Sequence, residues 1–440
     1  MQEREVDVAI IGSGTAGLNA MGRVRRSKKS FVLINGGEAG TTCARVGCMP
    51  SKVIIQVAED FHRRTLYPRM GIEGGEQLSV NIPEVMEHVR ELRDTFVDRV
   101  LSNSTDHLSE EEFIEQYARF LEPTLLELED GTRIRAGRVV IATGSTPVVP
   151  EAWKAFGDRV VTTDDFFELA ERIGGASDPK VVEAALDVIG KEFPLHLGHP
   201  VEISEEEDGR LRVTAGEQSV VVDKVLASMG RRPNIDRLDI ENLGIERDER
   251  GLLPYNPNTM QVADLPIFLA GDVDGTRPIL HEAGDEGKIA GYNAAHYPDI
   301  RAFKRKVRLS ITFCDPNIVS VGMRYEELDP ESTAIGEMKI APVGRALIMG
   351  RNRGTIRVYA DKGSGRLLGA EMCTPRGENL GHLLAWCLRH EVTVGHLIQM
   401  PFYHPVMEEA LQAALTALYH QVEAKNYSPV SELEPLEEST

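Results

Sequence analysis

Two cysteines five residues apart, Cys43 and Cys48, carry the most specific chemical signal in the chain. They lie in the segment 40–52, whose sequence is Gly-Thr-Thr-Cys-Ala-Arg-Val-Gly-Cys-Met-Pro-Ser-Lys, and Pro50 predicts that a helix begins at Cys48. A pair at this spacing can close a small disulfide ring, and a helix N-terminus lowers the pKa of a thiol placed there. Lys52 adds positive charge one turn further along. The pair is therefore predicted to cycle between a disulfide and a dithiol, with Cys48 remaining as the thiolate after reduction.

Three other interpretations of this pair stay open. A zinc site is disfavoured because no second Cys or His pair stands at ligand spacing nearby. A structural disulfide is disfavoured because the chain has five cysteines, an odd and low number without framework spacing. Two free buried thiols are the third alternative. The other cysteines, Cys314, Cys373 and Cys387, have no partner spacing and are expected to be small buried hydrophobic residues.

A glycine-rich turn near the N-terminus predicts a nucleotide-binding fold. It contains Gly12, Gly14 and Gly17 in the spacing Gly-x-Gly-x-x-Gly, after an apolar strand at 6–11 and before a helix and a second strand at 31–34. Such glycines let the backbone approach a pyrophosphate, whose charge is favoured at the helix N-terminus. A glycine-rich turn without a ligand is the alternative.

The residue that follows the second strand departs from the usual pattern. An Asp or Glu usually stands there and accepts hydrogen bonds from the ribose hydroxyls, but this chain has Asn35. Since an amide oxygen also accepts hydrogen bonds, we expect adenosine binding that is weaker rather than absent.

The composition limits the class of protein. A chain of 440 residues exceeds the size at which one hydrophobic core stops growing, so two or three domains are expected. The 69 acidic residues outnumber the 49 basic ones, and the formal net charge of −20 argues against nucleic acid and anionic membranes as partners. No apolar run is long enough to span a bilayer and the N-terminus shows no secretory signal, so we expect a cytoplasmic protein.

The remaining elements are predicted from apolar periodicity and turn residues. Asn81 is predicted to cap a helix that has Pro83 and Glu84 in its first turn. The others, in chain order, are a helix through Val53, Ile54, Val57 and Phe61, a strand at 138–142, a helix at 178–191, a hairpin at 201–213, strands at 221–229, 267–272, 355–360 and 366–372, and a helix at 407–418.

The cysteine segment resembles the redox-disulfide signature of the class I pyridine nucleotide–disulfide oxidoreductases, among them dihydrolipoamide dehydrogenase, glutathione reductase and mercuric reductase. Residues 142–145 (Ala-Thr-Gly-Ser) are similar to a mid-chain motif of that family. Residues 259–272, ending in Ala-Gly-Asp, resemble its second FAD motif, whose aspartate binds the ribityl chain. Residues 404–409 (His-Pro-Val-Met-Glu-Glu) resemble its C-terminal His-Pro-Thr-x-x-Glu, with Val406 in place of Thr. Dihydrolipoamide dehydrogenase is the nearest match, because the chain lacks a C-terminal Cys-Cys pair and its cysteine segment differs from that of glutathione reductase.

The resemblance implies an α/β fold with three domains and FAD as the cofactor. The domains are a Rossmann-like FAD-binding domain at 1–149 and 252–305, a truncated NAD(P)-binding domain at 150–251 and a C-terminal α+β dimerisation domain at 306–440. The residues that the resemblance assigns to FAD binding are Gly12, Gly14, Gly17, Asn35, Thr42, Lys52, Ala118, Thr143, Gly144, Ser145, Gly271 and Asp272.

His404 and Glu409 supply the second half of the predicted site. Dithiol–disulfide exchange needs a base that deprotonates the incoming thiol and later returns the proton, and imidazole titrates in the right range. Glu409, on the first turns of the following helix, is placed to orient that imidazole. In the family this histidine reaches the disulfide of the partner subunit, so the resemblance implies a homodimer.

One part of the family pattern is missing. Family members carry a second βαβ unit with its own glycine fingerprint for NAD(P)H, which should begin shortly after Leu169. The stretch 170–179 contains no Gly-x-Gly-x-x-Gly and follows no apolar strand, although 225–234 is similar to the family's closing strand and its Gly-Arg-x-Pro-Asn turn. We expect that the front half of this domain is deleted and that use of NAD(P) is doubtful. In the family, the lysine at the position of Lys52 pairs with a glutamate from the missing helix.

The leading hypothesis is a dihydrolipoamide dehydrogenase-like enzyme acting on a small dithiol, disulfide or lipoyl substrate. The substrate dithiol attacks Cys43, the interchange thiol, His404 of the partner subunit acts as the base, and Cys48 faces the flavin as the charge-transfer thiolate. Electrons pass to FAD and, in intact relatives, to NAD. One alternative is a FAD-binding redox relay or inactive dimeric flavoprotein without pyridine-nucleotide turnover. Another is a thiol oxidase that passes electrons to oxygen or a quinone.

Overall fold

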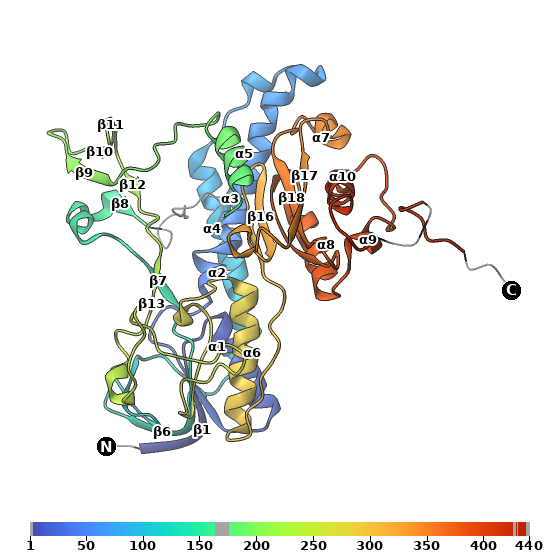
Figure 1. Ribbon diagram of the computed structural model, residues 1–440. Helices are drawn as coiled ribbons and strands as arrows, with labels where there is room; N and C mark the ends of the chain where they lie inside the picture. The colour runs from blue at the N-terminus through green and yellow to red at the C-terminus, as the bar shows by residue number, and fades with distance from the viewer. Residues whose placement is uncertain (1–2, 163–175, 426–427, 429, 437–440) are drawn as a thin grey trace. The chain divides into compact units, whose positions relative to one another are not determined.

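The computed structural model describes residues 3–162, 176–425, 428 and 430–436 (Figure 1). The chain divides into two compact units. The first unit contains the described residues of 1–168, 203–213 and 220–305, and the second those of 169–202, 214–219 and 306–440. The predicted FAD-binding segments fall within the first unit, and the predicted dimerisation segment falls within the second.

The core of the first unit is a seven-stranded sheet in the order β3-β2-β1-β6-β5-β4, with β14 paired to the end of β6. Strands β1, β2, β3, β6 and β14 are parallel, whereas β4 and β5 are antiparallel additions. The parallel strands are apolar and buried, which is typical of a sheet covered on both faces. The bounds are β1 Glu3–Ile11, β2 Phe31–Ile34, β3 Phe113–Ile114, β4 Ala118–Glu122, β5 Leu125–Leu128, β6 Arg133–Ile141 and β14 Ile267–Leu269, with α1 Thr15–Arg26, α2 Thr42–Arg45, α3 Cys48–His62, α4 Ile82–Ser102 and α6 Leu280–His296.

Helices α1 and α6 lie side by side, and glycines of α6 make this close packing possible (Figure 1). A Cβ added at Gly287 would lie 2.1 Å from the carbonyl oxygen of Ala16, and one at Gly291 would lie 2.4 Å from that of Ala20. A Cβ at Gly271, after β14, would meet the Cβ of Ala16 at 3.0 Å. The two helices therefore bring the loop after β14 next to the glycine turn that begins α1.

Two helix starts in the first unit were predicted, and one detail was wrong. Helix α3 begins at Cys48 and α4 begins after Asn81, as predicted. The Asn81 side chain, however, makes no capping hydrogen bond. An N-cap side chain binds the backbone N–H of the second or third helical residue. The second residue here is Pro83, which has no N–H, so only the N–H of Glu84 remains as a possible donor.

The described part of residues 150–251, which we call the middle segment, contains the three-stranded sheet β11-β10-β9 and two shorter pairings. Strands β8 and β12 pair in parallel over two residues each, and β13 pairs antiparallel with β7. The hairpin predicted at 201–213 is confirmed by adjacent strands β9 and β10. The single strand predicted at 221–229 is wrong: residues 221–222 end β11, residues 225–226 form β12 in a different sheet, and residues 227–229 are in no strand, because β12 has only two residues of β8 to pair with. The stretch 170–175, where the second glycine fingerprint was predicted to be missing, lies outside the described residues. The bounds are β7 Ser145–Pro147, β8 Val160–Val161, β9 Val201–Glu205, β10 Leu211–Ala215, β11 Gln218–Val222, β12 Val225–Leu226 and β13 Arg231–Pro233.

The second unit is built on a five-stranded antiparallel sheet in the order β15-β16-β19-β18-β17. Side chains alternate across β18, so that Ile356, Val358 and Ala360 join the core with helices α8 and α10, and Arg357 and Tyr359 point to the opposite face. The bounds are β15 Leu309–Thr312, β16 Asn317–Gly322, β17 Thr333–Lys339, β18 Thr355–Asp361, β19 Leu367–Thr374, α7 Gly344–Met349, α8 Gly377–Arg389, α9 Val394–Leu397 and α10 Glu408–Tyr419.

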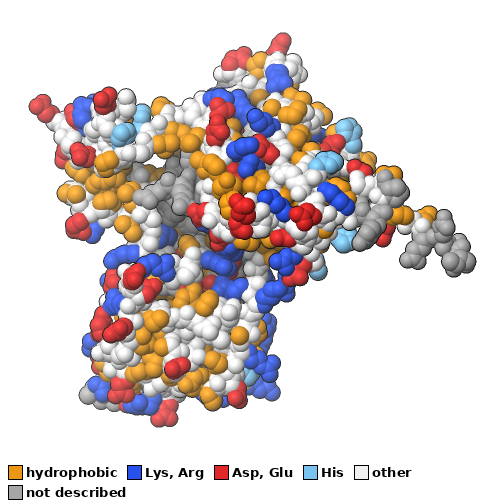
Figure 2. All heavy atoms as spheres, in the orientation of Figure 1, with side chains coloured by type: hydrophobic (Ala, Val, Ile, Leu, Met, Phe, Trp, Pro, Cys, Tyr) orange, Lys and Arg blue, Asp and Glu red, His pale blue; other side chains and the backbone are white. Residues whose placement is uncertain are grey.

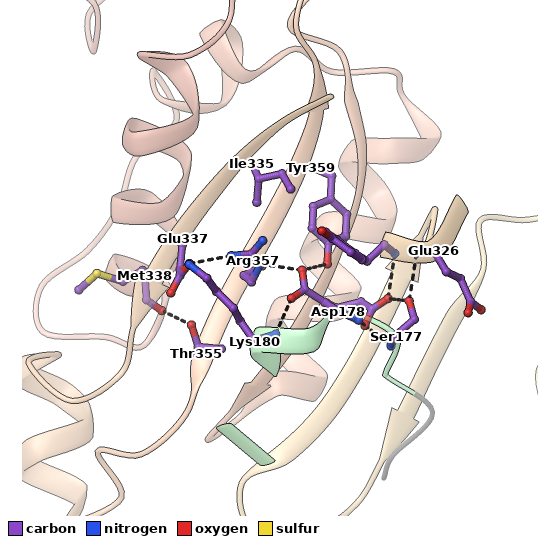
Figure 3. A network of polar contacts seen from close by, with 12 residues as sticks. Ser177, Asp178, Lys180, Glu326, Ile335, Glu337, Met338, Thr355, Arg357 and Tyr359 are labelled. Carbon is purple, nitrogen blue, oxygen red and sulfur yellow. Dashed lines mark hydrogen bonds and ion pairs between the residues drawn. The ribbon is translucent and has the colours of Figure 1, made fainter. Parts of the chain in front are cut away.

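Helix α5 (Pro179–Ile189) covers that opposite face of the sheet, and buried charges hold its start in place (Figure 3). Asp178 accepts hydrogen bonds from Arg357 Nε at 2.6 Å and from the Tyr359 hydroxyl at 2.8 Å. Glu371 of β19 accepts from the backbone N–H of Ser177 at 2.6 Å and of Asp178 at 2.8 Å. We call these five residues the sheet network. Both of its carboxylates are fully buried.

The surface of the described chain carries both signs of charge. Figure 2 shows basic and acidic side chains interspersed over the visible face, so the net negative charge is not gathered there into one large patch. No helix among the described residues is long and apolar enough to cross a membrane. Cys373 is buried, which confirms the prediction for that thiol, whereas Cys314 and Cys387 are only half-buried; all three pack in or against apolar clusters.

Candidate active site

Cys43 and Cys48 lie at two adjoining helix ends in the first unit. Cys43 is in the single-turn helix α2, which the hydroxyl of Thr41 caps, and Cys48 is the first residue of α3. Gly47 makes this junction possible, because a Cβ there would lie 3.0 Å from the carbonyl oxygen of Thr42. The backbone between the two cysteines therefore turns tightly enough to bring both thiols together.

The two thiols are free, and the hydrogen bond that Cys43 can donate to Cys48 is the main cause of the pKa shifts of both. Because the Cys43 thiol donates this hydrogen bond, the pKa of Cys48 falls to about 6. The positive charge of Lys52 also lowers the pKa of Cys48, whereas burial and the negative charge of Asp272 act in the opposite direction. The same hydrogen bond raises the pKa of Cys43, and burial of that thiol adds to the effect. These directions favour Cys48, rather than Cys43, as the thiolate of the reduced pair.

Glycine is favoured at the three positions of the first turn for different structural reasons. A Cβ at Gly12 would lie 2.2 Å from the carbonyl oxygen of Ala142, and one at Gly17 would lie 1.9 Å from that of Gly12. No atom of the described chain lies within 4 Å of a Cβ built at Gly14. Gly14, at the N-cap of α1, therefore leaves room for a ligand to approach the helix N-terminus, which favours the charge of a pyrophosphate.

Both the oxygen and the nitrogen of the Asn35 amide make hydrogen bonds within the protein. Its Oδ1 accepts a hydrogen bond from the backbone N–H of Ser13 at 3.2 Å, and its Nδ2 donates to the carbonyl oxygen of Gly37 at 2.6 Å. An amide oxygen has two lone pairs, so one acceptor position of Oδ1 remains for a ribose hydroxyl. Weaker adenosine binding through Asn35 stays a prediction.

The mid-chain motif and the second FAD motif meet in the structure. The Ser145 hydroxyl donates to Oδ2 of Asp272 at 2.8 Å. Burial raises the pKa of Asp272, whereas the Ser145 hydrogen bond and the charge of Arg231 act to lower it. Gly271 has a φ of +81°, and its N–H donates to the carboxylate of Glu286 at 2.8 Å.

These groups fit the requirements of FAD. The open backbone at Gly14 suits a pyrophosphate, and the half-engaged carboxylate of Asp272 suits the hydroxyls of a ribityl chain. The negative charge of Asp272 also acts on Cys48, so Asp272 lies within electrostatic reach of the thiol pair.

His404 and Glu409 lie in the second unit and form the predicted pair. Nδ1 of His404 is 2.8 Å from Oε1 of Glu409, and the other carboxylate oxygen accepts the N–H of Val406 at 3.0 Å. The hydrogen bond to His404 and that from Val406 lower the pKa of Glu409. The His404 side chain is 79 % exposed, so its other ring nitrogen is accessible from solvent.

The remaining predicted residues are placed as follows. Thr42 and Lys52 are exposed on the redox segment. Ala118 begins β4 and is buried in the apolar core of the first unit, so that only its backbone is suited to contact a ligand. The hydroxyl of Thr143 donates to the carbonyl oxygen of Asn234 at 2.7 Å. Gly144 has a φ of +70° and open space around its Cα.

Sequence reasoning missed three residues that support the site. Arg231 and Asn234 bind the mid-chain motif, and Glu286 holds the backbone of Gly271. The Gly-Arg-x-Pro-Asn turn was a usable signal for the first two. Glu286 had no local signal, because a buried glutamate in an amphipathic helix cannot be told from an exposed one by spacing alone. No cluster of three or more metal-binding side chains occurs among the described residues.

The combination of a dinucleotide-binding turn with a low-pKa thiol pair defines the class of the chain: it is a redox enzyme of the flavoprotein disulfide oxidoreductase type. Comparison with known families makes the assignment narrower. The model of the "Pyridine nucleotide-disulphide oxidoreductase" family matches residues 6–190 and 151–287, and that of its dimerisation domain matches residues 309–415. The chain belongs to this family, whose members use FAD and a pyridine nucleotide.

Several relatives align over nearly the whole chain. A dihydrolipoyl dehydrogenase of Haloferax volcanii is 29 % identical over 477 residues, covering 96 % of this chain and 98 % of the relative. A dihydrolipoyl dehydrogenase of Thermus scotoductus is 26 % identical, covering 94 % of this chain and 98 % of the relative. The HOCl-induced flavoprotein disulfide reductase RclA of Escherichia coli, solved as a Cu(II) complex, shares the fold with a TM-score of 0.78 at 19 % identity, covering 94 % of this chain and 99 % of that one.

The alignment with the Haloferax enzyme also shows that this chain is the shorter of the two over the aligned region. It extends over 477 residues, although this chain has only 440. The relative therefore carries residues that have no counterpart here.

Proposed function

We propose that the chain oxidises a small dithiol, of the dihydrolipoyl type that its relatives are named for, with Cys43 and Cys48 as the redox pair. The observation that carries the proposal is the position of the thiol pair, with Cys43 in α2 and Cys48 as the first residue of α3. Cys43 and Lys52 lower the pKa of Cys48, to about 6. A thiol with so low a pKa is a good leaving group when a disulfide is attacked. Cys43 is therefore the sulfur that the substrate attacks, and Cys48 is the thiolate that leaves.

The exchange proceeds in two balanced steps. One deprotonated substrate thiol attacks Sγ of Cys43 in the disulfide form, which breaks the Cys43–Cys48 bond, forms a mixed disulfide and releases Cys48 as a thiolate. The second substrate thiol, once deprotonated, attacks the substrate sulfur of the mixed disulfide and releases Cys43, which takes up a proton. The substrate leaves as a disulfide, and the protein pair has gained two electrons.

His404 of the partner subunit is proposed as the base for these steps. Glu409 holds Nδ1 of the imidazole, and this hydrogen bond leaves Nε2 free to accept a thiol proton and later return it. The exposed imidazole and the match of residues 309–415 to the family's dimerisation domain support action across a homodimer. The low, unpatterned cysteine count supports a reducing compartment, and we propose the cytoplasm.

Bound FAD would accept the electron pair from the reduced thiols. Gly14 would hold its pyrophosphate, Asp272 its ribityl hydroxyls and Asn35 its ribose. Cys48 is the thiolate proposed to lie nearest the flavin, because Lys52 and the start of α3 both stabilise its charge.

An anaerobic titration of the purified flavoprotein with dihydrolipoamide tests the proposal. We expect a long-wavelength absorption band at about one equivalent, produced by contact between the Cys48 thiolate and the flavin. Cys48→Ser should not form this band, and Cys387→Ser, at a half-buried thiol of the second unit, should form it as the native protein does. A native protein without the band, or a Cys48→Ser variant that is reduced identically, would disprove the assignment.

A second candidate is a redox relay that does not turn over pyridine nucleotide. The longer relatives and the short pairings of the middle segment favour it, since the second nucleotide fingerprint is the usual pyrophosphate site for NAD(P). An NADH–lipoamide assay, with the Haloferax enzyme as a positive control, separates the two. Steady turnover at micromolar NADH would rule out the relay, and dithiol-dependent oxygen uptake without nicotinamide would instead indicate a thiol oxidase.

A further inference from the structure

The Gly-Arg-x-Pro-Asn turn of the middle segment is bound to the mid-chain FAD motif at several points. The backbone N–H of Asn234 donates to the carbonyl oxygen of Gly144 at 3.0 Å. Its side-chain Nδ2 donates to the carbonyl oxygen of Thr143 at 3.0 Å, and its Oδ1 accepts the hydroxyl of Thr146 at 2.6 Å. Strand β13 pairs with β7 alongside these contacts. The turn thus holds the backbone and side chains of 143–146 in one arrangement.

Arg231 extends this contact to the second FAD motif. Its Nε donates to the Ser145 hydroxyl at 2.8 Å, and its Nη2 donates to the Ser145 carbonyl oxygen at 2.8 Å. The Ser145 hydroxyl has a single proton, which it donates to Oδ2 of Asp272 at 2.8 Å. Because the hydroxyl accepts from a guanidinium, it is polarised toward the carboxylate, and its direction is fixed by the donor behind it.

We propose that Arg231 is a positioning residue for FAD binding, which acts through the Ser145 hydroxyl to hold Asp272 as an oriented carboxylate with Oδ1 available to the ribityl chain. The turn that remains from the second nucleotide-binding domain then serves the first cofactor site. This inference rests on the proposed placement of FAD at Asp272, but it needs neither dithiol turnover nor NAD(P).

The charges around Asp272 determine how FAD binding is expected to depend on pH. Burial raises the pKa of Asp272, as does the charge of Asp274, while Ser145 and Arg231 lower it. Asp272 in turn acts on the thiol of Cys48, and the carboxylate of Glu286 accepts the N–H of the neighbouring Gly271. Removing the Arg231 charge therefore moves the pKa of Asp272 further upward, so that the carboxylate is lost as the pH falls. A protonated carboxyl accepts a hydroxyl hydrogen bond less well.

The experiment measures release of FAD from the holoprotein by the rise in flavin fluorescence after dilution, from pH 5.5 to 8.5. We expect Arg231→Met to weaken FAD binding about 10- to 100-fold at the acidic end, with a smaller loss at pH 8.5. Arg231→Lys keeps the charge and should show a smaller loss without the new pH dependence. Arg232→Met is the matched control, because Arg232 is exposed and pairs with Asp236 at the surface.

A double-mutant cycle decides whether Arg231 acts through Asp272. Asp272→Asn should weaken FAD binding at all pH values, and adding Arg231→Met to it should cause little further loss. Equal losses in the two backgrounds, or a loss in Arg232→Met as large as in Arg231→Met, would overturn the proposal. If the native protein binds FAD as described but is not reduced by dithiols, the proposed function fails and this inference stands.

Discussion

The ionisable groups of the thiol pair in the first unit and of the sheet network in the second unit differ in exposure to solvent and in hydrogen bonding. Cys48 is exposed and has a pKa moved to about 6, with Cys43 and Lys52 as the main sources of that shift. In the sheet network, the buried carboxylates of Asp178 and Glu371 are surrounded by donors from other described residues. A shifted pKa with open access is typical of reactive sites, whereas full compensation of buried charge is typical of structural ones. The comparison supports the proposed chemistry of the thiol pair and indicates a structural role for the sheet network.

The largest effect is expected at the thiol pair. Cys48→Ser should lower the rate of dithiol oxidation at least about a thousandfold, because a serine can neither form the disulfide nor leave as a thiolate. Its melting temperature should change little, since the side chain is exposed. Stopped-flow reduction by dihydrolipoamide and a thermal melt check both statements. A large loss of stability with residual activity would contradict the assignment of chemistry to this pair.

His404 tests whether the second unit also contributes chemistry. Replacing it by Gln should lower the rate of the dithiol half-reaction about 10²- to 10⁴-fold, because the proton acceptor is lost. The pH dependence of that rate should flatten as well, which a purely structural residue would not cause. His382→Gln is a matched control, since that exposed histidine only contacts the backbone of its own helix in the described contacts. Equal pH profiles for the native protein and His404→Gln would remove His404 from the mechanism.

Asp178 tests the structural half of the comparison. Asp178→Ala should destabilise the second unit by about 3–5 kcal/mol, because Arg357 would be left buried with one partner fewer. Asp187→Ala, on the exposed face of the same helix, should cost less than about 0.5 kcal/mol, since its pair with Lys191 is at the surface. Urea unfolding followed by circular dichroism measures both. The rate of Cys48 alkylation should be unchanged in both variants. A slower reaction in Asp178→Ala would contradict the claim that the sheet network acts independently of the thiol pair.

The smallest expected effect concerns the charge beside Cys48. The alkylation rate of Cys48 by iodoacetamide should rise with pH through a midpoint near 6, below the usual range of thiols, because only the thiolate reacts. Lys52→Met removes a positive charge that favours the thiolate, so the midpoint should move up and the rate at pH 6 should fall roughly 3- to 10-fold. Lys29→Met, at a surface pair with Asp7, should leave the midpoint in place. Peptide mass spectrometry resolves Cys48 from the other thiols, and an unchanged midpoint in Lys52→Met would count against an electrostatic role.

Much of the fold was predictable because its signals are local. The βαβ opening, the helix at Cys48, the antiparallel strands of 355–372 and the helix after 407 follow from apolar periodicity and turn residues. The strand predicted at 221–229 failed because strand formation depends on a partner, and β8 offers β12 only two residues. Asn81 is the N-cap residue of α4, as predicted, but its side chain makes no capping hydrogen bond, and Pro83 removes one of the two N–H groups that it could bind.

The sequence by itself determined the positions of the proposed redox pair, the glycine turn and the histidine–glutamate pair, since each lies within a few residues of chain and uses residue types with few other purposes. Only the tertiary structure decided which distant side chains complete them. Ser177 and Glu371 are 194 residues apart, and Ser145 and Arg231 are 86 apart. No local pattern encodes such pairs, because a buried Glu or Arg is chosen by the groups that folding brings to it, and these are known only once the sheets have formed.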